Sequence, residues 1–164
     1  MRLYIYYANQ CDPKKCTGKK LARFELATLV RDVRRLPRGA LLLNPFVDEI
    51  VSRADAGAGR LCVLDCSWEH AREVFTSCRY RLRSRRLPFL LAANPVSFGK
   101  AHRLTTAEAF AASLFIMGYT EHAHRVLEKF NWGHTFFELN EHPLDDYASA
   151  ATPEGVREAE GWYV

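Results

Sequence analysis

The alternation of apolar and polar residues predicts an N-terminal half in which short strands alternate with helices. Apolar runs of strand length occur at residues 2–7, 39–43, 60–65 and 86–93. Between the first two runs, residues 17–35 carry apolar side chains at helical spacing, and residues 46–55 and 68–80 show shorter helical patterns. Strands that alternate with helices indicate a mostly parallel sheet with helices packed on it.

The pattern changes after Gly99, where residues 105–118, 121–131 and 135–150 have the periodicity of consecutive helices. At the junction, the stretch "LLAANPVSFG" (90–99) passes from an apolar run into Asn94, Pro95 and Gly99. Proline cannot extend a strand, and glycine permits a backbone conformation that side chains disfavour. We therefore predict an α/β domain over residues 1–93 and an all-helical domain over residues 94–164.

Two predicted helix starts carry threonine. Thr17 has the character of an N-cap, and Thr105 with Glu108 fits the capping-box spacing, which puts Thr106 at the first helical position. A helix start offers N–H groups suited to a carboxylate or phosphate, although an ordinary capped helix is the simpler interpretation of Thr17. Ligands of open parallel sheets bind at the carboxyl ends of strands, so these starts are candidate binding elements.

Two further residues stand at the predicted end of the strand over 60–65. Asp65 ends the strand and Trp68 enters the next helix. A carboxylate in this place serves as a general base or caps the helix, and a tryptophan belongs to the core or forms the wall of an apolar pocket. The residues alone leave both alternatives open.

The net charge of +4 is modest but unevenly distributed. Residues 79–86 hold five arginines and no acid, and residues 14–23 hold five basic residues and no acid, whereas acids gather after Glu121. Two concentrated basic segments on a folded chain indicate a polyanionic partner, with a solvated surface as the alternative.

The five cysteines are Cys11, Cys16, Cys62, Cys66 and Cys78. The chain starts with a strand-like run in place of an apolar leader, so we expect free thiols in the cytoplasm. No apolar run approaches the roughly 20 residues of a membrane span, so we expect no membrane contact. The C-x4-C spacing of the first two cysteines has no second pair to complete a zinc site, so we expect no metal.

Four motifs in this order resemble the small-subunit ribosomal RNA aminocarboxypropyltransferase family: "QCDPKKCTGKKL", "VLDCSW", "RLPFLLAANPVSFGKAHRLTTAEA" and "FNWGHTFFELN". The resemblance runs from about Tyr4 to Tyr147. It implies a SPOUT-like fold in which the chain after the last strand forms a trefoil knot, with the knot loop in the C-terminal domain. It also implies S-adenosylmethionine as donor and small-subunit rRNA or the pre-ribosomal small subunit as partner, and we expect a monomer.

The implied reaction transfers the 3-amino-3-carboxypropyl group to N3 of a pseudouridine, N1-methylated or not, and releases 5′-methylthioadenosine. The resemblance implies the cofactor residues Thr17, Leu64, Trp68, Ala71, Leu87, His102 and Thr106. The two threonines would hold the donor carboxylate, Leu64 the ribose, Leu87 and His102 the adenine, and Trp68 with Ala71 the methyl group.

Asp65 fits a base that removes the N3 proton. The expected RNA contacts are Lys14, Lys15, Lys19, Lys20, Arg23, Arg83 and Arg85. His102 departs from the tyrosine common in the family, and "NPVSFG" departs from the asparagine-tyrosine pair common there. A methyltransferase of similar fold and a ribosome-assembly RNA-binding protein without catalysis remain as alternatives.

Overall fold

The computed structural model describes residues 1–8, 16–66, 68–79 and 81–164, with the backbone alone for residues 68 and 69. The chain divides into two compact units, each described by itself. The first comprises residues 1–48 and 58–86, and the second comprises residues 49–57 and 87–164. The change at 86/87 differs from the expected domain boundary at 93/94, which stays a prediction.

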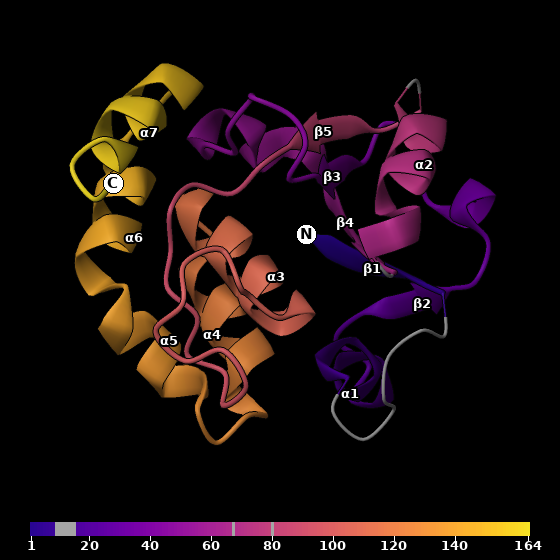
Figure 1. The fold of residues 1–164 in the computed structure, drawn as a ribbon, viewed down its shortest axis with the longest axis horizontal. Helices are drawn as coiled ribbons and strands as arrows, with labels where there is room; N and C mark the ends of the chain where they lie inside the picture. Colours follow the sequence, from indigo (N-terminus) through magenta and orange to yellow (C-terminus); the bar gives the residue numbers. More distant parts are fainter. Residues whose placement is uncertain (9–15, 67, 80) are drawn as a thin grey trace. The chain divides into compact units, whose positions relative to one another are not determined.

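In the described residues, the first unit is built on a five-stranded sheet with the order β2-β1-β4-β3-β5 (Figure 1). The strands are β1 (Arg2–Tyr7), β2 (Thr28–Val30), β3 (Leu41–Leu43), β4 (Arg60–Asp65) and β5 (Arg83–Arg85). Every pairing is parallel, so the carboxyl ends of all strands lie at one edge of the sheet. All three leucines of β3 are buried, as in a strand covered on both faces.

The helices of the first unit are α1 (Thr17–Arg23) and α2 (Trp68–Cys78), with a 3-10 helix at Val33–Arg35. The prediction of a helix over 68–80 is confirmed to within two residues. The helix predicted over 17–35 ends much earlier, since Glu25 has a left-handed backbone with φ of 60° and residues 28–30 pair with β1. The apolar side of α2 supplies Phe75 and Cys78 to the core, where they join Leu42 and Cys62 of the sheet.

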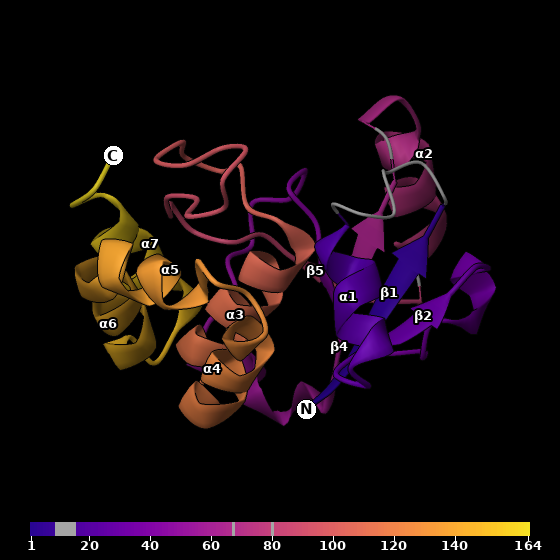
Figure 2. The same ribbon diagram turned by 90° about the horizontal axis from the view of Figure 1, so that it is seen from below.

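The second unit contains α3 (Thr106–Ile116), α4 (Thr120–Glu128), α5 (Gly133–Leu139), α6 (Glu141–Ser149), α7 (Pro153–Glu160) and a 3-10 helix at Arg53–Ala58. Helix α3 is buried along nearly its whole length and packs against α4 and α6 (Figure 2). The 3-10 helix is tied to the other helices, because the Tyr119 hydroxyl donates to the Ala56 carbonyl and the Arg53 guanidinium donates to the Ala148 carbonyl.

The expected SPOUT-like fold with a trefoil knot is wrong. That expectation required a last sheet strand over 86–93 that leads the chain into the knot. Residues 87–93 instead belong to the second unit and form no strand, with only an antiparallel bridge between Leu91 and Ala101. The N–H groups of Leu91 and Ala93 donate to the side chains of Asn140 and Glu108, and that of Ala92 donates to the Lys100 carbonyl. The observed architecture is a parallel α/β sheet followed by helices.

Among the described residues, no helix combines the length and the hydrophobicity needed to cross a membrane.

Candidate functional site

In the first unit, the predicted base Asp65 lies where the end of β4 meets the start of α1. Asp65 is the last residue of β4 and is half-buried. Its carboxylate accepts a hydrogen bond from the Cys16 thiol, with 3.3 Å between Sγ and Oδ2. Its backbone carbonyl accepts the N–H of Ala8, which follows β1. The carboxylate is thus anchored at the carboxyl edge of the sheet, where a ligand site is expected.

The start of α1 differs from the sequence prediction in its cap. Cys16 is the N-cap, and its sulfur accepts the Lys19 N–H at 3.5 Å, so Thr17 is the first helical residue and not the cap. Cysteine is not among the preferred N-cap residues, so no sequence signal indicates this role. Thr17 is half-buried on the first turn of α1.

Gly18 explains how α1 comes so close to the strands. A Cβ on this buried glycine would lie 3.3 Å from Ile5 Cδ1 and 3.6 Å from Asp65 Oδ2. A side chain larger than alanine at position 18 would therefore displace the helix from β1 and β4. The close approach lets the first turn of α1 and the Asp65 carboxylate share one small region.

The other cofactor residues predicted in the first unit have different surroundings. Leu64 precedes Asp65 on β4 and is half-buried, so it belongs to the same region. Ala71 is buried on α2 within the core that contains Phe75 and Cys78. Trp68 begins α2, and its side chain lies outside the described residues.

Three thiols of the first unit, those of Cys62, Cys66 and Cys78, belong to the core or pack against it. Burial raises the pKa of Cys62 to about 12, with Cys78 adding to the shift. Burial also raises the pKa of Cys66 and of Cys78 above the usual thiol range. Protonated thiols are poor metal ligands, and within the described part of the chain no three His, Cys, Asp or Glu residues gather as a metal site would require. Cys11 lies outside that part.

In the second unit, the capping box predicted at the start of α3 is confirmed and extended. Thr105 Oγ1 accepts the Glu108 N–H, and Glu108 Oε2 accepts the Thr105 N–H at 2.7 Å and its hydroxyl at 2.9 Å. The same carboxylate accepts the N–H groups of Ala93 and Asn94 at 2.7 and 3.1 Å and the Asn94 side-chain amide at 2.9 Å. Glu108 is fully buried, so one carboxylate joins both ends of the loop over residues 94–104 to α3.

Within this loop the chain folds back on itself. The Gly99 N–H donates to the Ala92 carbonyl at 2.7 Å, and the His102 N–H donates to the Leu90 carbonyl at 3.1 Å. The reversal requires left-handed backbone at Gly99 (φ 76°) and at His102 (φ 58°). The role expected of Gly99 is thereby confirmed, whereas a strained histidine is not predictable from the sequence.

The predicted cofactor residues of the second unit lie on or near this loop. Thr106 is half-buried at the first position of α3, and Leu87 is half-buried ahead of the loop. His102 is exposed, and its ring meets the edge of Phe89 with 5.7 Å between centroids. The seven predicted cofactor residues are therefore divided between the units, with Thr17, Leu64, Trp68 and Ala71 in the first and Leu87, His102 and Thr106 in the second.

The basic residues predicted to contact RNA do not form one patch in the described structure. Lys19, Lys20 and Arg23 are on α1, which contacts the edge strand β2. Arg83 and Arg85 are on β5, the opposite edge strand of the sheet. Lys14 and Lys15 lie outside the described residues.

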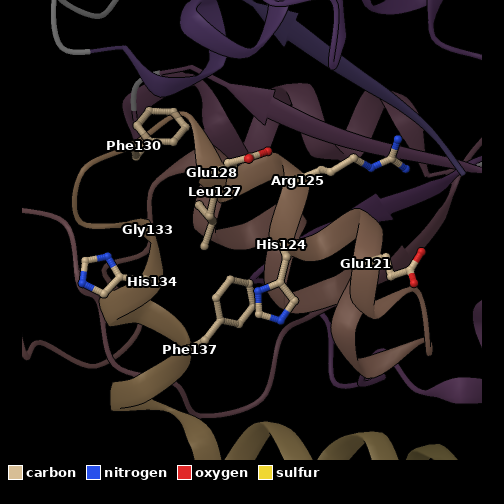
Figure 3. Close-up of a pocket in the computed structure, with 9 residues that line it drawn as sticks. All are labelled: Glu121, His124, Arg125, Leu127, Glu128, Phe130, Gly133, His134 and Phe137. Atoms are coloured by element: carbon tan, nitrogen blue, oxygen red, sulfur yellow. The ribbon is translucent and has the colours of Figure 1, made fainter.

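A surface pocket of about 540 Å³ opens on α4 and α5, where the sequence predicts no site (Figure 3). The rings of His124 and Phe137 stack in it with 4.0 Å between centroids, whereas the Arg125 side chain points away from this stack. The lining also includes Glu121 and Glu128, so its charge is mixed.

Two family models match the chain. "Ribosome biogenesis protein, C-terminal" matches residues 41–164, and "Possible Fer4-like domain in RNase L inhibitor, RLI" matches residues 1–34. Among curated relatives, a protein of Methanosarcina acetivorans named 16S rRNA aminocarboxypropyltransferase is 52% identical over 99% of this chain and 94% of its own length. The protein of the same name from Halobacterium salinarum is 50% identical over 90% of this chain and 87% of its own length.

A solved structure has the same fold. It is described as the SAM-dependent rRNA:acp-transferase Tsr3 from Vulcanisaeta distributa, with a TM-score of 0.86 and 36% identity. The match covers 98% of this chain and 96% of that one. This likeness replaces the SPOUT-like class expected from the sequence.

Proposed function

The chain belongs to the family of 16S rRNA aminocarboxypropyltransferases, and from this membership we infer that it transfers the 3-amino-3-carboxypropyl group of S-adenosylmethionine to small-subunit rRNA. The observation that carries this function is the 52% identity to a relative of that name over nearly the whole of both chains. The likeness to a SAM-dependent rRNA:acp-transferase structure agrees with it. The protein is therefore an S-adenosylmethionine-dependent transferase of ribosome biogenesis.

The acceptor atom is our finer proposal: N3 of a pseudouridine, N1-methylated or not. Bound S-adenosylmethionine supplies a sulfonium with three electrophilic carbons, so the placement of the nucleophile decides which carbon–sulfur bond breaks. Attack by N3 on the aminocarboxypropyl carbon forms a C–N bond, breaks the bond from that carbon to sulfur, and leaves 5′-methylthioadenosine. The N3 proton must go to a base.

We propose that Asp65 is this base. Support comes from its place at the carboxyl end of β4, its partial exposure and the Cys16 thiol that fixes its orientation. A carboxylate held in this way is ready to accept a proton from a nearby N–H. The alternative role is structural, with Asp65 joining the start of α1 to the sheet.

We propose that Thr17 and Thr106 bind the donor carboxylate, that the Leu64 backbone binds the ribose, and that Leu87 and His102 frame the adenine. The residues present fit these tasks in their chemistry. Both threonines are half-buried first residues of helices, where hydroxyl and N–H donors favour an anion. Trp68 with Ala71 would supply the apolar recess for the methyl group, and the burial of Ala71 in the core agrees with an apolar recess there.

The experiment that tests the function identifies the nucleoside product. The protein is incubated with S-adenosylmethionine and an in vitro transcript of 16S rRNA that carries pseudouridine, and the products are separated by mass spectrometry. We expect 5′-methylthioadenosine. S-adenosylhomocysteine as the sole product would instead establish a methyltransferase. A protein that gives no heat on titration with S-adenosylmethionine would be an RNA-binding protein without catalysis.

We also propose that the protein acts in the cytoplasm as a monomer. The described cysteines carry free thiols, which suits a reducing compartment. Sedimentation velocity measures the mass of the particle in solution, and a value twice the chain's 18.8 kDa would contradict a monomer.

A further inference from the structure

The loop that Glu108 holds displays two large apolar side chains to solvent. Val96 is 79% exposed and Phe98 is 60% exposed. In the described part of the second unit, the other large apolar side chains with comparable exposure are Trp162 and Val164, which belong to the last three residues of the chain. Val96 and Phe98 lie far from the chain ends, between two buried segments, so an exposed position here is not the effect of a loose terminus.

The backbone beneath these side chains is firmly held. Asn94 Oδ1 accepts the Ser97 N–H at 2.9 Å, and the Asn94 amide donates to the buried Glu108 carboxylate and to the Arg103 carbonyl. The Lys100 N–H donates to the Ser97 carbonyl at 2.9 Å, and the Lys100 carbonyl accepts the Ala92 N–H at 3.0 Å. A fixed loop loses little conformational entropy when a ligand contacts its tip.

The charged residues of the loop itself have one sign. Lys100 and Arg103 are exposed cations, exposed His102 lies between them, and residues 95–103 contain no acid. The nearby Glu108 carboxylate is buried and directed at loop donors. An exposed aromatic ring with flanking cations suits single-stranded nucleic acid, whose bases stack on rings and whose phosphates bind cations.

We propose that Phe98 stacks on an unpaired base of the rRNA substrate, while Lys100 and Arg103 contact phosphates of the same strand. This inference deepens the proposed function, on which it rests, by naming an element that recognises RNA apart from the lysines of α1. Two apolar side chains with a cationic surround form too small an apolar surface for a stable protein–protein interface, which buries about 800 Å² per partner. RNA is therefore the occupant that the charges favour.

The test compares Phe98 variants in RNA binding and in cofactor binding. We expect Phe98→Ala to weaken binding of a 16S rRNA transcript by about 5- to 150-fold, the range that corresponds to the loss of one base–aromatic stack. The affinity for S-adenosylmethionine, measured by calorimetry without RNA, should not change. Because the side chain is mostly exposed, the melting temperature should also stay the same.

Matched variants separate stacking from other effects. Phe98→Trp keeps a ring and should keep the affinity for RNA, whereas Phe98→Leu keeps only apolar surface and should lose it. Trp162→Ala removes another exposed ring, 65% exposed, and should leave RNA binding unchanged.

Three outcomes would overturn the inference: Phe98→Ala binding RNA as tightly as the unmodified protein, Phe98→Leu retaining full affinity, or cofactor affinity falling as far as RNA affinity. The second would indicate an apolar contact of the kind that a protein partner makes, and the third a cofactor contact. The unmodified protein's yield of 5′-methylthioadenosine tests the proposed function separately. If Phe98→Ala binds RNA normally while the unmodified protein still releases 5′-methylthioadenosine, this inference is rejected and the proposed function stands.

Discussion

Glu108 illustrates at the scale of one residue how hydrogen-bond donors stabilise a buried carboxylate. A carboxylate removed from water is stable when N–H and O–H donors replace its hydration. Glu108 has five such donors, from Ala93, Asn94 and Thr105. The sequence predicts the part of this arrangement that is local, the capping box. It does not predict the bonds to Ala93 and Asn94, because these depend on how the loop returns to α3.

The first prediction concerns this carboxylate. Glu108→Gln keeps the shape of the side chain but places an NH₂ group against at least two N–H donors. We expect the free energy of unfolding to fall by about 2–4 kcal/mol, the scale of lost bonds to a buried charged group. Urea denaturation measures it. Glu138→Gln, at an exposed position on α5, is the control and should change stability by less than about 0.5 kcal/mol. A Glu108→Gln protein as stable as the control would show that the five bonds are worth little.

The second prediction concerns Asp65. If its carboxylate removes the acceptor proton, Asp65→Asn should lower kcat by about 10²- to 10⁴-fold, the range typical of general-base catalysis, while the affinity for S-adenosylmethionine is retained. The measurement is the release of 5′-methylthioadenosine under saturating rRNA. Cys16→Ser, which keeps a hydrogen-bond donor toward Asp65, serves as the control and should remain active. An unchanged kcat in Asp65→Asn would leave the carboxylate with a structural role alone.

At the scale of elements, helical periodicity fails where tertiary pairing competes with it. Residues 17–35 have helical spacing throughout, yet the chain reverses at Glu25 and residues 28–30 join the sheet beside β1. Nothing near Glu25 in the sequence marks a turn, because neither glycine nor proline stands there. The pairing of Leu29 with Ile5 is a contact between distant residues, and a local pattern does not contain it.

The helix predicted over 135–150 fails for a reason that is visible in the sequence. It divides into α5 and α6 at Asn140, and Pro143 follows on the first turn of α6. Proline lacks the N–H that would bond back to residue 139, so it is tolerated near a helix start and not inside a helix. The Asn140 side chain then bonds to both the N–H and the carbonyl of Leu91. The proline predicts the break between the two helices, but only the structure shows that the Asn140 side chain at this break binds the backbone of Leu91.

The third prediction belongs to the junction of α4 and α5. A Cβ at buried Gly133 would lie 2.8 Å from the Leu127 carbonyl carbon and 3.0 Å from the Leu127 Cβ, contacts that force the two helices apart. We expect Gly133→Ala to lower the free energy of unfolding by about 2–3 kcal/mol, as overpacking does. Thermal denaturation gives the value. At Gly57 of the same unit a Cβ meets nothing within 4 Å, so Gly57→Ala should be neutral or slightly stabilising. Equal stability of the two variants would contradict the close approach.

At the scale of the whole molecule, local features around the candidate site are predictable from the sequence, but their arrangement in space is not. The ends of β1 and β4, the capping box and the backbone of Gly99 follow from local rules, and the structure bears them out. The anchoring of Asp65 by Cys16, 49 residues away, does not follow from such rules. Lys19, Lys20 and Arg23 of one basic segment are on α1, which contacts the edge strand β2. Arg83 and Arg85 of the other are on the opposite edge strand, β5, because strand order is decided by long-range pairing.

The fourth prediction concerns the α1 edge of this sheet. Replacing Lys19 and Lys20 by glutamate should weaken RNA binding and leave S-adenosylmethionine binding nearly unchanged. The plot of log affinity against log salt concentration has a negative slope. If each lysine contacts one phosphate, the double variant should make this slope shallower by about 1.4–1.8. Filter binding of a 16S rRNA transcript at several salt concentrations measures it. The control replaces Arg34 and Arg35, of which Arg34 is already paired with Asp32 at 2.8 Å. An equal loss in both double variants would mean that net charge alone controls binding.

The membership of residues 49–57 in the second unit has a consequence for the order of events during synthesis. The ribosome releases this segment between β3 and β4, but its partners come much later: the Tyr119 hydroxyl is 63 residues downstream of Ala56, and the Ala148 carbonyl is 95 residues downstream of Arg53. The parallel sheet has all its strands once Arg85 has emerged, whereas the segment must wait for α6. A ribosome-bound chain from which only residues 1–86 have emerged therefore lacks both of these bonds, and protease cleavage at Arg53 should disappear only after residue 148 has emerged.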